Sequence, residues 1–125
     1  PTAFDAEEFG VLLSSFPPSR ITALLQELEW SIAESVEVIK VDLARGCNGG
    51  VAKRAHRLAG TAASFALRNL QAASADLETA VLSSSDDDVQ ISQAASQALS
   101  EAKRALADIA VLSDEIRANA SKAVD

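Results

Sequence analysis

The sequence predicts an all-α fold: an antiparallel up-and-down four-helix bundle, with a short N-terminal helix capping one end. Alanine and leucine, both strong helix formers, dominate a chain of 125 residues that is 48% hydrophobic. Only five glycines and three prolines interrupt it. Apolar residues recur at three- and four-residue steps, which is the spacing of one face of an α-helix. The length fits a single domain over residues 1–125.

Five helical segments are expected, at about residues 5–15, 18–46, 49–65, 67–82 and 87–118. Pro17 and Pro18 separate the first two segments, and Gly46 ends the second. Asn48 is a favourable N-cap for the third segment. A polar stretch at 83–88 precedes the fifth segment, and 119–125 are expected to form a frayed tail. Short connections between long amphipathic helices are typical of an up-and-down bundle.

The fifth segment carries a near-heptad apolar stripe with small residues in its first half, which allows close helix–helix approach. Its members are Ile91, Ala95, Ala98, Ala102, Ala105, Ile109, Leu112 and Ile116. Such periodic apolar faces are the ordinary requirement of a bundle core, so this stripe is interpreted as core and not as a cofactor site.

Charge and composition exclude several classes of function. The net charge of −7 argues against nucleic-acid binding by the whole molecule. No apolar run is long enough to span a membrane, and no signal peptide is evident. The single cysteine, Cys47, excludes an internal disulfide and a cysteine-based metal cluster, and it favours a cytoplasmic location. We expect a monomer without a cofactor of its own. Whether Pro1 follows a removed methionine or begins an excised domain stays open.

His56, the only histidine, is the leading candidate for chemistry. Its neighbours on one helix face are Ala52, Ala59, Gly60 and Ala63, all small, so the imidazole is expected to stand clear of a flat strip. Glycine inside a helix costs roughly 1 kcal/mol relative to alanine, so Gly60 suggests either open access to the imidazole or close packing against a neighbouring helix.

The surroundings of His56 are predicted to be basic. No Asp or Glu occurs between Leu43 and Ala75, and this stretch holds Arg45, Lys53, Arg54, Arg57 and Arg68. A cationic rim suits a phosphoryl group or an anionic partner, although an ordinary solvated helix face is the alternative. Across the turn near Ala66, Glu78 should lie at a height similar to that of His56. A carboxylate there would fix the ring tautomer, unless Glu78 is only an exposed helix residue.

The segment from Ala55 to Leu70 resembles the signature of histidine-containing phosphotransfer (HPt) domains of two-component phosphorelays. The family pattern is roughly A-H-x-L-K-G, then five variable residues, G, three variable residues and L. The matching residues are Ala55, His56, Leu58, Gly60 and Leu70. The resemblance in helix plan and length extends over nearly the whole chain.

The resemblance implies that His56 takes a phosphoryl group through Nε2 and that Glu78 occupies the position of a Gln or Glu that hydrogen-bonds it. The family lysine falls on Ala59 and the second glycine on Ala66. Lys53, one turn before His56, is therefore the candidate substitute cation, with Arg57 a weaker one. Ala66 is expected to soften the turn and lengthen the helices slightly.

The implied partners are a response regulator receiver domain, which brings Mg²⁺ and most catalytic groups, and a hybrid sensor histidine kinase. On this interpretation the chain is a transfer intermediate and not an enzyme with its own turnover. The expected docking surface comprises Ala52, Arg57, Ala59, Gly60, Ala63 and Ser64.

Three other functions stay open. The bundle could be purely structural or mediate interactions, with His56 incidental. It could be the histidine-bearing domain of a chemotaxis-type kinase, which an ATP-binding domain phosphorylates directly. A metal-dependent helical-bundle enzyme is the weakest alternative, because such sites need several histidines and carboxylates.

Overall fold

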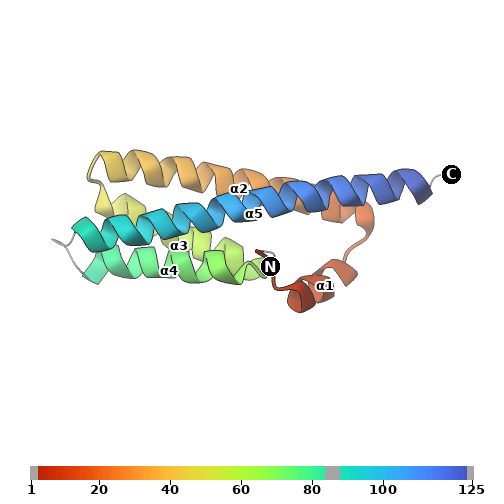
Figure 1. Ribbon diagram of the computed structural model, residues 1–125, viewed down its shortest axis with the longest axis horizontal. Helices are drawn as coiled ribbons and strands as arrows, with labels where there is room; N and C mark the ends of the chain where they lie inside the picture. Colours follow the sequence, from red (N-terminus) through yellow and green to blue (C-terminus); the bar gives the residue numbers. More distant parts are fainter. Residues whose placement is uncertain (1–2, 84–87, 124–125) are drawn as a thin grey trace.

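The computed structural model describes residues 3–83 and 88–123, and all regular structure in these ranges is helical. The helices are α1 (Ala6–Ser14), α2 (Pro18–Ala44), α3 (Asn48–Ser64), α4 (Arg68–Ser83) and α5 (Asp88–Ala123). In Figure 1 the four long helices lie side by side along the longest axis, and α1 lies near one end. Both α2 and α4 pack against α3 and α5, so each long helix has two neighbours. None of the helices described is long and apolar enough to cross a membrane.

The core is aliphatic on α2, α3 and α4 and small on the first half of α5. Six members of the predicted α5 stripe are buried, namely Ile91, Ala95, Ala98, Ala102, Ala105 and Ile109, and Leu112 and Ile116 pack partly against the core. Large side chains from the other helices fill the space that these alanines leave, among them Leu25, Leu28, Ile32, Ile39, Val51, Leu58, Leu70 and Leu77. The predicted role of the stripe as core is therefore confirmed.

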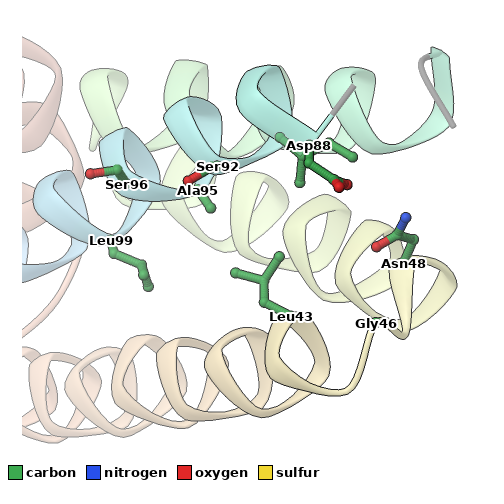
Figure 2. Close-up of a pocket in the computed structure, with 9 residues that line it drawn as sticks. Leu43, Gly46, Asn48, Asp88, Ser92, Ala95, Ser96 and Leu99 are labelled. Atoms are coloured by element: carbon green, nitrogen blue, oxygen red, sulfur yellow. The ribbon is translucent and has the colours of Figure 1, made fainter. Parts of the chain in front are cut away.

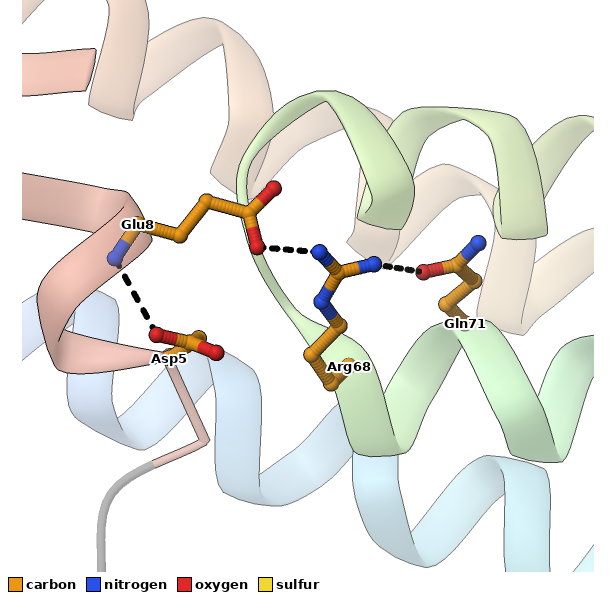
Figure 3. Close-up of polar contacts among 4 residues, drawn as sticks. All are labelled: Asp5, Glu8, Arg68 and Gln71. Atoms are coloured by element: carbon orange, nitrogen blue, oxygen red, sulfur yellow. Dashed lines mark hydrogen bonds and ion pairs between the residues drawn. The ribbon is translucent and has the colours of Figure 1, made fainter. Parts of the chain in front are cut away.

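The short helix α1 is fastened to the turn between α3 and α4. The Asp5 side chain caps α1 by accepting from the Glu8 backbone N–H at 3.1 Å, and the Asp5 N–H donates to the Ala66 carbonyl at 2.8 Å. Arg68 forms an ion pair with Glu8 and donates to the Gln71 side chain at 3.4 Å (Figure 3). These bonds hold α1 against the start of α4, at the end of the bundle where the turn between α3 and α4 lies.

Two boundary predictions differ from the structure. Cys47, not Asn48, is the N-cap of α3, and no side chain caps that helix. The fifth helix continues to Ala123, past its predicted end at residue 118 and into the stretch 119–125 that was expected to form a frayed tail, while 124–125 lie outside the described residues. The residues that follow Ala118 include alanine, lysine and serine with no proline or glycine, and nothing among them ends a helix. Of the expected polar break, residues 84–87 also lie outside the described part.

The turn between α3 and α4 keeps its sharpness without glycine. Ala66 adopts a φ of +60°, in the left-handed region that glycine occupies at low cost. The N–H of Leu67 donates to the Ala62 carbonyl at 2.9 Å and closes the end of α3. The expectation that Ala66 would soften this turn and lengthen the helices is therefore wrong. The turn instead contains an alanine in a strained, left-handed backbone conformation.

Candidate functional site

His56 lies in the middle of α3, on the side of the helix that faces away from the core. Its side chain is 77% exposed. The residues on the opposite side of α3 are buried, and they are Val51, Ala55, Leu58 and Ala62. The amphipathic pattern of α3 therefore anchors the helix and presents the imidazole to solvent.

Glu78 of α4 holds one edge of the imidazole ring. His56 Nδ1 lies 3.1 Å from both carboxylate oxygens of Glu78. A carboxylate only accepts hydrogen bonds, so Nδ1 carries the proton that is donated to it. In the neutral ring this assignment leaves Nε2 with its lone pair free, and Nε2 has no partner among the described residues. Glu78 is 27% exposed, so its packing restricts where the carboxylate can go. The juxtaposition expected from the hairpin is present.

Gly60 opens the surface one turn after His56. A Cβ built on Gly60 would meet no atom within 4 Å, and the residue is exposed. Close packing against another helix therefore does not explain this glycine. Ser64, one turn further, is also exposed, and its hydroxyl donates to the Gly60 carbonyl at 3.1 Å.

The alanines of the expected strip are less exposed than the sequence suggested. Ala59 and Ala63 are half-buried. Ala52 is only 6% exposed and belongs to the core cluster, so its place in an exposed docking surface is wrong. The open surface beside His56 instead extends along Lys53, Arg57 and Gly60, which are all exposed.

The basic surface is smaller than the sequence indicates, because other helices bring carboxylates to it. Arg54 pairs with Glu34 of α2 at 3.5 Å. Arg68 pairs with Glu8 of α1. Within the described ranges no ion pair engages Lys53 or Arg57. These two cations are therefore the positive charges left available next to the imidazole.

A hollow between α2 and α3 contains both cations. It has a volume of about 330 Å³ and is lined by Val38, Asp42, Gly50, Lys53, Arg54 and Arg57. A Cβ on Gly50 would come within 2.3 Å of Asp42 Oδ2, so glycine is what lets the Asp42 carboxylate lie against α3. Sequence reasoning missed Asp42 and Gly50, since only the approach of the two helices brings them together.

The arrangement suits nucleophilic transfer better than metal chemistry. An oriented imidazole with a free Nε2, open space beside it and cations one turn away can attack a phosphoryl group and neutralise part of its charge. In the part of the chain that the structure describes, no group of three or more His, Cys, Asp or Glu residues could hold a metal ion.

Comparison with known protein families gives a match over most of the chain. A family model described as Hpt domain matches residues 23–119, which include α3, α4 and nearly all of α2 and α5. Neither the curated proteins nor the solved structures contain a match to this chain.

Proposed function

This chain belongs to the Hpt domain family, and from that membership we propose that His56 accepts a phosphoryl group from a receiver-domain phospho-aspartate and passes it to a response regulator. The family carries out histidine phosphotransfer in two-component systems. The observation that carries the assignment to His56 is its 3.1 Å contact with Glu78, which leaves Nε2 free on a ring that is 77% exposed. The proposal treats α2 to α5 as an antiparallel up-and-down four-helix bundle that supports this ring.

The proposed step forms one bond and breaks one bond. The Nε2 lone pair attacks phosphorus, the bond between phosphorus and the aspartyl oxygen breaks, and the aspartate leaves as a carboxylate. The ring then carries a positive charge, which the Glu78 carboxylate at Nδ1 stabilises. The transition state is loose, so positioning and charge neutralisation provide most of the acceleration. Lys53 supplies the cation, and Gly60 leaves room for the receiver's pocket to close over the ring.

The partner domain supplies the remaining chemistry in this proposal. The receiver brings Mg²⁺ and the aspartate, and a hybrid sensor histidine kinase feeds the relay. This chain contributes a nucleophile, a docking face around Arg57, Gly60, Ala59, Ala63 and Ser64, and charge. It is thus a phosphoryl carrier without turnover of its own.

Phosphotransfer profiling tests the proposal. The purified chain is incubated with each receiver domain of its source organism, labelled at the aspartate with radioactive phosphate, and separately with ATP-binding kinase domains. We expect rapid labelling by at least one receiver. Labelling only by a kinase domain with ATP would support the chemotaxis-type alternative. No labelling from any donor would leave a structural or interaction bundle as the better description.

A further inference from the structure

The surface around His56 continues from α3 onto α4. Glu78, which accepts a hydrogen bond from His56 Nδ1, has Ala75 one turn before it and Leu82 one turn after it on the same face of α4. Ala75 and Leu82 are both exposed. Because α4 packs against α3, these three residues form a row alongside the imidazole. The only charge in this row is that of Glu78, which already contacts the ring.

Leu82 is the large apolar side chain that this row presents to solvent. Among the large apolar side chains that are exposed in the described ranges, it is the most exposed, at 69%. The others lie on α1, α2 and α5, so Leu82 alone belongs to the pair of helices that contains His56 and Glu78. An exposed leucine gains free energy when a partner covers it, in proportion to the apolar area that is buried.

Leu82 lies within the area that a receiver bound over His56 would cover. Leu82 and Gly50 are equally far along the chain from the turn at Ala66, so they lie at similar heights in the helix hairpin. Gly50 is about 9 Å from His56 along the helix axis at 1.5 Å per residue, and packed helices are about 9 Å apart, which places Leu82 roughly 13 Å from His56. A round interface of about 800 Å² per partner has a radius of about 16 Å.

The two sides of α3 differ in what a partner would cover. The imidazole contacts Glu78, so a pocket that closes over the ring also covers the neighbouring part of α4. The hollow on the α2 side is lined mainly by charged residues, namely Asp42, Lys53, Arg54 and Arg57. Charged groups lose hydration when they are covered, whereas alanine and leucine gain free energy. The α4 row therefore suits the buried part of an interface, and the charged hollow suits its solvated rim.

The groove between α2 and α5 does not adjoin this surface. It has a volume of about 680 Å³, and Leu43 of α2 and Leu99 of α5 extend into it (Figure 2). Its lining contains no residue of α4, and from α3 it contains only Asn48, about two turns before His56. Since α3 packs between α2 and α4, and α5 lies diagonally across the bundle from it, a receiver seated in this groove would not cover the imidazole.

We propose that Leu82 is a receiver-binding residue, which sets the affinity for the phosphoryl donor and takes no part in the chemistry. The inference rests on the proposed function, because that function places the receiver over His56. An apolar side chain at the edge of the receiver's active site covers Leu82 and Ala75 while the pocket closes over the ring. A receiver with a charged side chain at that position would lose hydration without compensation, so Leu82 also discriminates among receivers.

Rapid-quench measurements of phosphoryl transfer at increasing receiver concentration test the inference. The donor is the receiver domain that labels the whole chain fastest, phosphorylated at its aspartate with radioactive phosphate. Leu82→Ala should raise the half-saturating receiver concentration about fivefold or more and leave the saturating rate constant unchanged. Leu82→Gln, polar but of similar length, should also weaken binding. Leu82→Met retains the apolar area and should restore most of the affinity.

Val41→Ala is the matched control, because it truncates an apolar side chain that is 44% exposed on α2, and it should change neither quantity. Circular dichroism of each variant establishes that the fold is retained.

Three results would overturn the inference alone, with the unmodified chain still taking label. The first is an unchanged half-saturating concentration in Leu82→Ala and Leu82→Gln. The second is a loss of affinity in Val41→Ala as large as that in Leu82→Ala. The third is a lower saturating rate constant at an unchanged half-saturating concentration, since Leu82 would then act on the chemistry and not on binding. No label on the unmodified chain from any receiver would overturn the proposed function and this inference together.

Discussion

Glu78 of α4 holds His56 of α3 by its Nδ1 at 3.1 Å, and this contact joins the two helices at the proposed site. Glu78→Ala removes the acceptor, so the ring turns freely and the phosphoimidazole loses its counter-charge. We expect the rate of phosphoryl acceptance to fall about tenfold. Glu78→Gln keeps an acceptor oxygen and should recover part of that rate. Glu29→Ala, at an exposed position on α2, is the control. Equal rates in all three variants would refute the orienting role.

Gly60 should show opposite effects on stability and on transfer. Gly60→Ala adds a methyl group into open space within a helix, so the free energy of unfolding should rise by about 0.5–1 kcal/mol. The same methyl narrows access to His56, so transfer should slow, and Gly60→Arg should slow it further. Gly10→Ala in α1 also meets no atom within 4 Å, and it should stabilise without any change in transfer. Faster or unchanged transfer in both Gly60 variants would contradict the access role.

Lys53 is the proposed replacement for the cation that the family places at Ala59. Lys53→Ala should slow phosphoryl transfer by a few-fold, up to about tenfold, because one positive charge near the transferring oxygens is lost. Arg45→Ala removes the same charge from the exposed C-cap of α2 and should have little effect. Stopped-flow or quench measurements with one receiver compare the two. If the two variants behave alike, general electrostatic attraction explains the effect and Lys53 has no specific role.

The positive φ of Ala66 leads to a prediction about how two glycine substitutions, Ala66→Gly and Ala62→Gly, change the free energy of unfolding. Ala66→Gly relieves a positive φ that costs about 1–2 kcal/mol in alanine, but it loses a buried methyl worth about 0.8 kcal/mol and adds chain entropy to the unfolded state. We expect a net change below about 1 kcal/mol. Ala62→Gly, at a fully buried helical position, should cost about 2 kcal/mol. Urea unfolding measures both. Equal losses would mean that the positive φ of Ala66 carries no strain.

Much of the fold could be predicted because apolar residues recur along the chain at a clear helical spacing. The α5 stripe from Ile91 to Ile109 is buried as expected, and α1 to α4 begin and end close to their predicted limits. The His56–Glu78 juxtaposition was also accessible, since equal distances from a hairpin turn place two residues at the same height. These features depend on local spacing, which the sequence contains.

The remaining features depend on contacts between helices. Ala52 is close to His56 on the helical wheel, yet it lies at the edge of the buried arc, and one alanine cannot reveal where that edge falls. Glu34 and Glu8 neutralise Arg54 and Arg68 from helices distant in sequence. Gly50 and Asp42 meet only because α2 and α3 approach closely. None of these partners has a sequence spacing that identifies it.

The central claim is that His56 itself carries the phosphoryl group, and His56→Gln tests it most directly. A glutamine there keeps size and polarity at an exposed position, so the fold and its unfolding transition should be retained. With a labelled cognate receiver, the wild-type chain should gain acid-labile label and His56→Gln should gain none. Acid-labile label retained in a folded His56→Gln variant would contradict the account.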